Sequence, residues 1–152
     1  MPNDQATLKR PSKPDYKLVF DLMPGMCLVL DTSFTILSQN KAYAEATLST
    51  AKNVVGRGLF EVFPDNPGDY NASGVSAVRQ SLLNVLKTRQ PDHMPIVRYD
   101  VEADSGKFEQ RFWAISNTPI LGDDGYVRWI INRAEDVTEL VELRKKAEVT
   151  WI

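Results

Sequence analysis

The chain has 152 residues, a formal net charge of −2 and one cysteine, Cys27. This length suits one domain with a sizeable core, and the charge balance gives no electrostatic basis for binding nucleic acid. A lone cysteine excludes an intramolecular disulfide, and no run of about 18 apolar residues or signal-like segment predicts membrane insertion or export. We therefore expect a cytoplasmic domain.

The first elements are a leader, a helix and a hairpin. Residues 1–13 are polar and rich in proline, which is typical of a flexible leader. Residues 14–23 place three large apolar side chains at helical spacing and end before a Pro-Gly pair. Two short strand-like runs follow at residues 26–30 and 34–38 (MCLVL and FTILS). The three residues between them predict a hairpin.

The middle of the chain is predicted to be helical on both sides of an irregular stretch. Asn40 can cap a short helix over residues 41–48. Residues 49–70 contain several glycines and prolines and are predicted to be irregular. Residues 76–89 then place apolar side chains on one stripe, which predicts an amphipathic helix.

Three longer strands follow. They are predicted over residues 93–102, 107–120 and 126–134, and glycine-containing turns separate them. Because these pairings are local, an antiparallel meander is the natural interpretation. Together with the hairpin, the strands predict one five-stranded antiparallel sheet with helices on one face, which is an α+β fold.

A polar helix is predicted over residues 135–149. Asp136 and Glu139 have the spacing of a capping box at its start. The apolar residues Leu140, Leu143 and Ala147 have heptad-like spacing, but they cover less than two heptads, so a coiled coil is only suggested. No glycine stop precedes Ile152, and we expect this helix to continue in a longer parent protein.

Several short motifs, in this order and spacing, resemble a PAS domain. The similarity is closest to the PAS domains that precede the kinase core of bacterial sensor histidine kinases, and it covers roughly residues 16–140. The motifs that carry it are Gly56-Arg57, LFEVFPDNP (59–67), Asn117-Thr-Pro119, GDDG (122–125) and Glu135-Asp-Val-Thr138.

The resemblance implies a sensory module that is not itself an enzyme. It implies a PAS domain over residues 14–137 and the start of a signalling helix over 138–152. Such domains bind a small molecule between sheet and helices and relay its state to a C-terminal output, here expected to be a histidine kinase. They form homodimers through the N-terminal helix, the outer sheet face and the C-terminal helix. One alternative is a ligand-free dimerisation and relay module, and another is a flavin- or haem-bound redox sensor.

The residues argue against the best-known cofactors of the family. Flavin photosensors carry a reactive cysteine at the position that matches Leu59, so a covalent flavin adduct is not expected. Haem sensors commonly use a histidine of the long helix, whereas the only histidine, His93, is at the start of a predicted strand. The segments Gly56-Arg-Gly58 and DNPGD (65–69) lack the spacing of phosphate and calcium loops. We predict no metal site and no catalytic residue, and the ligand stays unidentified.

Candidate pocket residues follow from strand alternation, with the inward face assigned by similarity to flavin-binding PAS domains. They are mostly apolar with a few polar tips, as in small-molecule pockets. A ligand-free core would use the same side chains equally well. The predicted ligand-binding set is Leu28, Leu30, Leu59, Phe60, Phe63, Val97, Tyr99, Trp113, Ile115, Asn117, Ile130 and Asn132.

The expected exit for a signal is the junction between the last strand and the last helix. Asp136 and Thr138 can both accept hydrogen bonds from free N–H groups at the helix start. They would couple the strand to the helix, although the same residues also make an ordinary helix cap. Arg57 could hold an anionic ligand, but a surface ion pair is the favoured interpretation.

Overall fold

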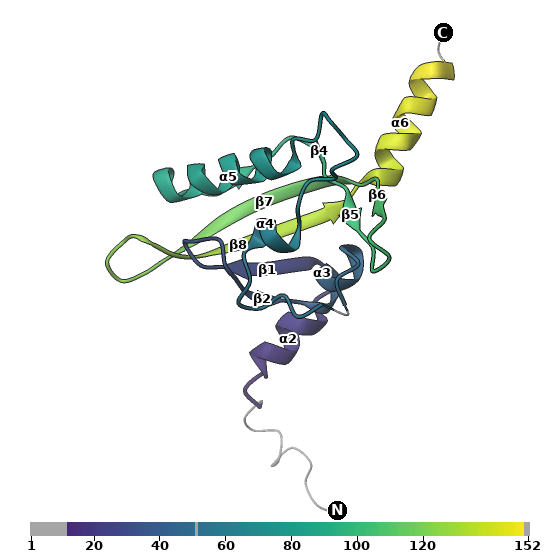
Figure 1. Ribbon diagram of the computed structural model, residues 1–152. Coiled ribbons are helices and arrows are strands. Elements are labelled where there is room, and N and C mark those ends of the chain that lie inside the picture. The colour runs from purple at the N-terminus through teal and green to yellow at the C-terminus, as the bar shows by residue number, and fades with distance from the viewer. Residues whose placement is uncertain (1–11, 51, 151–152) are drawn as a thin grey trace, which may run out of the picture.

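The computed structural model describes residues 12–50 and 52–150, so most of the predicted leader lies outside the described residues. Its main sheet is antiparallel, with the strand order β2-β1-β8-β7-β3, and β4 also pairs with β7. Figure 1 shows the two longest strands, β7 and β8, side by side at its centre. The strands are β1 (Met26–Leu30), β2 (Ile36–Gln39), β3 (Asp92–His93), β4 (Val97–Arg98), β7 (Phe112–Leu121) and β8 (Val127–Asp136).

The predicted long strands over residues 93–102 and 107–120 are wrong, because both are interrupted. Pro95 separates β3 from β4, since proline cannot donate to a ladder. The Asp100 carboxylate accepts the Arg111 N–H at 3.3 Å. A side chain thereby replaces a backbone partner at the point where the second strand breaks. Beyond the interruptions, β5 (Val101–Glu102) and β6 (Phe108–Glu109) form a separate two-stranded sheet.

The helices follow the predicted order with shifted bounds. They are α2 (Tyr16–Leu22), α3 (Lys41–Ala46), α4 (Leu59–Val62), α5 (Gly74–Thr88) and α6 (Thr138–Thr150). The cap predicted at Asn40 is confirmed, because its Oδ1 accepts the N–H of Tyr43 at 3.0 Å. The same oxygen accepts the Cys27 N–H, which ties the helix to β1.

The start of the last helix corrects the prediction of a helix over residues 135–149. Glu135 and Asp136 still belong to β8, where they pair with Ala114 and Trp113 of β7. The ladder keeps these residues extended, so α6 begins only at Thr138. None of the helices in the described ranges is long and apolar enough to cross a membrane.

The core lies between one face of the sheet and the helices α3, α4 and α5. Helix α5 runs along the sheet (Figure 1) and buries Val78, Leu82 and Val85 against it. The opposite face keeps apolar side chains in contact with solvent, with Leu37, Ile120 and Trp129 each 36–39% exposed. Helix α2 contacts α3 and buries none of its own residues.

Candidate ligand pocket

A small cavity of about 50 Å³ lies between the sheet and the helical segment. Its walls come from β1, β7 and β8 on one side and from α3, α4, α5 and the segment around β5 on the other. The lining is mostly apolar with a few polar groups, which is the mixture typical of ligand sites. The residues that line it are Met26, Tyr43, Thr47, Leu59, Phe63, Val78, Tyr99, Asp100, Val101, Trp113, Ile115, Asn132 and Ala134.

The structure divides the predicted ligand-binding residues into two groups. Those that line the cavity are Leu59, Phe63, Tyr99, Trp113, Ile115 and Asn132. The others pack into or against the surrounding core: Leu28, Leu30, Asn117 and Ile130 are buried, whereas Phe60 and Val97 are partly buried. The inward face inferred for β7 and β8 is the face that packs against the helices.

Seven lining residues are absent from the predicted set: Met26, Tyr43, Thr47, Val78, Asp100, Val101 and Ala134. The sequence contained a signal for Tyr43 and Thr47, because residues 40, 43 and 47 lie on one face of a helix. All three of those residues are buried. No pattern pointed to Asp100, since a single carboxylate in a strand-like run is usually exposed.

Tyr99 connects three walls of the cavity. Its hydroxyl donates to the carbonyl oxygen of Phe63 at the end of α4. Its own carbonyl oxygen accepts the indole N–H of Trp113 at 2.7 Å. Its ring lies against the first residue of α5, where a Cβ added to Gly74 would come within 2.6 Å of the Tyr99 Cγ. Through its side chain and its backbone carbonyl, this one residue contacts α4, α5 and β7.

A chain of side-chain hydrogen bonds runs from Tyr43 and Asn132 in the cavity wall to Asp92. The Tyr43 hydroxyl donates to Asn132 Oδ1 at 2.9 Å, and Asn132 Nδ2 donates to Asn117 Oδ1 at 2.7 Å. Asn117 Nδ2 donates to Ser81 Oγ at 2.9 Å, and that hydroxyl donates to Asp92 Oδ2 at 2.6 Å. Every polar group in this buried chain therefore has a partner, as buried polar groups require.

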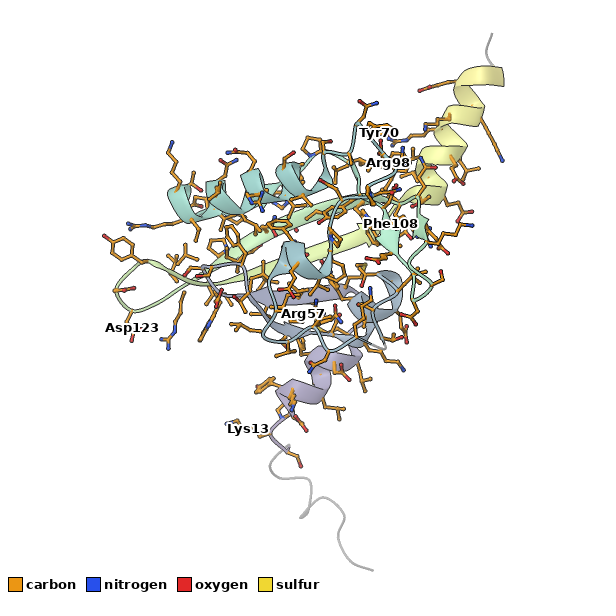
Figure 2. All side chains as sticks on the ribbon, viewed as in Figure 1. Lys13, Arg57, Tyr70, Arg98, Phe108 and Asp123 are labelled. Atoms are coloured by element: carbon orange, nitrogen blue, oxygen red, sulfur yellow. The ribbon has the colours of Figure 1, made fainter. Side chains whose placement is uncertain are left out.

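Asp100 places a carboxylate in the cavity wall. Burial raises its pKa, but hydrogen bonds from Arg98, Asn66 and the Arg111 N–H, together with the charge of Arg98, hold the pKa below its usual value. The guanidinium of Arg98 contacts both carboxylate oxygens at 3.0 Å. Figure 2 shows Arg98 at the end of the domain from which α6 leaves. The carboxylate is therefore charged and already paired.

The two cavity tyrosines keep their protons. Burial raises the pKa of Tyr43 and, to a similar degree, the pKa of Tyr99. Neither phenol ionises at neutral pH, so both act as hydroxyl groups rather than as anions. Their protons already bind acceptors within the protein.

The residues do not fit a flavin. Ligand pockets for larger molecules measure roughly 300–1,000 Å³, several times the volume of this cavity. Leu59 lies in the wall at the position where the resemblance to photosensors would need a cysteine. Arg57, which could have held an anionic ligand, instead forms an exposed ion pair with Glu61, in which Nη2 and Oε1 lie 2.9 Å apart.

The junction between β8 and α6 contains a local hydrogen-bond network. Asp136 Oδ1 accepts the Thr138 N–H at 3.0 Å and the Thr138 hydroxyl at 2.6 Å. The Thr138 oxygen in turn accepts the N–H of Phe112, the first residue of β7, at 2.9 Å. Arg111 lies 3.6 Å from the other Asp136 oxygen. The start of the helix is thereby bonded to both central strands.

A family model for the PAS fold matches residues 20–142. A comparison with curated protein sequences gave no match. The fold is similar to the PAS domain of a Colwellia psychrerythraea protein (14% identity, 82% of this chain and 95% of that one, TM-score 0.63). It also resembles a sensory box sensor histidine kinase from Vibrio cholerae (15% identity, 89% and 92% covered, TM-score 0.54).

A third similar structure is VqmA bound to DPO, with 20% identity, 80% of this chain and 56% of that one covered, and a TM-score of 0.55. VqmA is a Vibrio cholerae protein in another of the matching structures. At these identities the structural likenesses show the fold, and the family model supplies the assignment, since its match extends over most of the chain. The chain belongs to the PAS-fold family.

Proposed function

We propose that this domain is a sensory module that binds a small molecule in the cavity and relays its state through α6 to a C-terminal output. The resemblance in the sequence makes a histidine kinase the expected output, and one of the structurally similar proteins is a sensor histidine kinase. Another is described with a bound small molecule, DPO. These likenesses support the proposal by analogy of fold.

The observation that carries the proposal is the position of Trp113. This residue lines the cavity, and its direct partner in the β7–β8 ladder is Asp136. Asp136 accepts the N–H of Thr138, the first residue of α6. A ligand that displaces the Trp113 side chain would therefore act one ladder position away from the helix start. Its effect is limited to its differential affinity for the two arrangements of the junction.

Relay through a helix is most effective between two copies, and we propose a homodimer. Exposed apolar residues occur on α2, on the outer sheet face and on α6, at Tyr16, Leu22, Trp129, Leu140 and Leu143. Large exposed apolar surfaces mark interaction sites. If a Trp129→Glu variant sediments as a dimer, as the wild type is expected to, the outer sheet face is not part of the dimer interface.

A ligand-free dimerisation and relay module is the second candidate, and the cavity volume favours it. A cavity of about 150 Å³ holds benzene, whereas this one measures about 50 Å³. In this alternative, the side chains around Trp113 simply fill the core. The Asp136 junction would then transmit only changes that arise elsewhere in the parent protein.

Native mass spectrometry of the purified domain, followed by denaturing extraction, separates the two candidates. A co-purified small molecule that is lost from a Trp113→Phe variant would support ligand sensing. If no molecule is found and no compound of a small-molecule library shifts the melting temperature, the ligand-free module becomes the better account.

A further inference from the structure

We propose that the cavity selects small uncharged molecules that carry a hydrogen-bond donor, and that Asp92, outside the cavity, sets this preference. The inference rests on the proposed ligand-binding function and specifies the chemistry of its ligand. It follows from the direction of the hydrogen-bond chain that begins at Asp92 and ends in the cavity wall at Tyr43.

The direction of the chain is fixed at its far end. A carboxylate has no proton to donate at neutral pH, so the Ser81 hydroxyl must donate its proton to Asp92 across the 2.6 Å contact. The Ser81 oxygen can then only accept from its other partner, which is Asn117 at 2.9 Å. The amide nitrogen of Asn117 must therefore face Ser81.

The same constraint passes along both asparagines to the cavity. With its nitrogen turned to Ser81, Asn117 presents its oxygen to Asn132, whose Nδ2 donates at 2.7 Å. Asn132 then presents its own oxygen to Tyr43, and the phenol must donate at 2.9 Å. Tyr43 and Asn132 both line the cavity, so this last hydrogen bond lies in its wall. The Tyr43 oxygen keeps lone pairs but has no proton for a ligand.

The hydroxyl and indole protons of the wall are committed in the same way, and of the two N–H donors of the Asn132 amide one binds Asn117. The Tyr99 hydroxyl donates to the Phe63 carbonyl, and the Trp113 indole donates to the Tyr99 carbonyl. The Thr47 hydroxyl donates to the Tyr43 carbonyl at 2.7 Å. Because a hydroxyl that donates one proton still accepts two hydrogen bonds, the wall offers acceptors where a ligand would need them.

Charge adds a second filter. Among the described residues that line the cavity, none is lysine, arginine or histidine. The nearest fixed charge is the Asp100 carboxylate, whose oxygens are already occupied by Arg98, Asn66 and the Arg111 N–H. An anionic ligand would lose its hydration without gaining a counter-ion or a free hydroxyl or indole donor, which is a large penalty in a buried site. A neutral donor avoids this penalty.

Two five-membered rings of similar size test the inference, pyrrole as an N–H donor and cyclopentanone as a carbonyl acceptor. Their dissociation constants would be measured by nuclear magnetic resonance titration, with the Trp113 indole and the Asn132 amide as reporters. One matched hydrogen bond contributes about 0.5–1.5 kcal/mol, so pyrrole should bind the wild-type domain about two- to thirteenfold more tightly.

The variants place the cause at Asp92. In Asp92→Asn the terminal amide can donate as well as accept, so the chain can run in both directions and the ratio of the two constants should fall toward one. Ser81→Ala, which disconnects the chain from Asp92, should have the same effect if Asp92→Asn folds poorly. Tyr43→Phe removes one of the acceptors and should also lower the ratio. The same carboxylate-to-amide change at Asp123, in an exposed turn, should leave the ratio unchanged.

The outcomes separate this inference from the proposed function. If cyclopentanone binds as tightly as pyrrole, or more tightly, the donor preference is wrong while the pocket stands. If Asp92→Asn and Ser81→Ala both keep the wild-type ratio, the role of Asp92 is wrong. If neither ring binds the wild-type domain or a folded Ile115→Ala variant with an enlarged cavity, the proposed pocket fails and the inference fails with it.

Discussion

The ring of Tyr99 lies directly against the backbone of Gly74, so that a Cβ at residue 74 would come within 2.6 Å of the Tyr99 Cγ and 2.8 Å of Cδ2. The contact joins the segment beside the cavity to the first residue of α5. It makes a side chain at position 74 incompatible with the present position of the Tyr99 ring.

Gly74→Ala should therefore destabilise the domain. A glycine-to-alanine change within a helix usually stabilises by roughly 0.5–1 kcal/mol, but here we expect a loss of about 1–3 kcal/mol because the ring must move. Urea unfolding measures the difference. Gly58→Ala is the control, since its Cβ would meet Glu61 Cβ at an ordinary 3.8 Å. A Gly74→Ala variant that is as stable as wild type would show that the Tyr99 ring yields without cost.

Tyr43→Phe should lower the free energy of unfolding by about 1–3 kcal/mol, because it leaves the buried Asn132 oxygen without its donor. Tyr43 is 7% exposed and donates to that oxygen at 2.9 Å. The matched control is Tyr16→Phe, which removes the same atom from a side chain that is 66% exposed. Equal stabilities for the two variants in urea would contradict the importance of the buried bond.

Asp100 should make the stability of the domain depend on pH in the acidic range. Its pKa is lowered in the folded state, so the folded domain binds fewer protons than the unfolded chain as the pH approaches the usual aspartate value. The stabilisation is present above the unfolded pKa of about 3.9 and is lost as the pH falls through the folded value.

Asp100→Asn measures this contribution. An asparagine side chain has only one acceptor oxygen, so it cannot accept both hydrogen bonds from Arg98. We therefore expect the free energy of unfolding to fall by about 1–3 kcal/mol at pH 7. The difference from wild type should shrink as the pH falls below the unfolded value of about 3.9 and through the lowered folded value, where wild-type Asp100 itself becomes protonated. Urea unfolding at a series of pH values follows it. A difference that does not shrink with acid would mean that the charge of Asp100 does not contribute.

Asp136→Ala should loosen the start of α6. The change removes the acceptor of the Thr138 N–H, and loss of such a capping group costs about 1 kcal/mol. Amide hydrogen exchange should accelerate in the first turns of α6 by roughly fivefold, which corresponds to that free energy, and change little in β1. Glu142→Ala, an exposed substitution in the same helix, is the control. Unchanged exchange in the first turn would argue against Asp136 as the residue that joins strand and helix.

Local patterns in the sequence predicted the elements whose causes are local. Asn40 caps α3 as expected, and the apolar stripe of α5 packs on the sheet. The interruption of the first long strand also has a signal in the sequence, because Pro95 within a strand-like run argues against a continuous strand. The break at Asp100 had no such signal, because it depends on a hydrogen bond to Arg111, eleven residues away.

The pocket residues divide in the same way, into those that local patterns predict and those that depend on contacts between distant residues. Strand alternation put Trp113 and Ile115 on one face of their strand, and the resemblance to flavin-binding PAS domains assigned that face, together with Asn132, as inward. All three residues line the cavity. The contribution of Tyr43 depends on how α3 packs against β8, 89 residues away at Asn132. The direction of the hydrogen-bond chain needs five side chains from different elements at once. Neither periodicity nor spacing can report such an arrangement.

The interruption of the strands at Pro95 and Asp100 also bears on aggregation. A long unpaired strand at the side of a sheet is a template on which further chains can add. Here β3 and β4 are two residues each, and a proline that cannot donate a hydrogen bond lies between them. Growth of the sheet by addition of another chain at this side is therefore disfavoured.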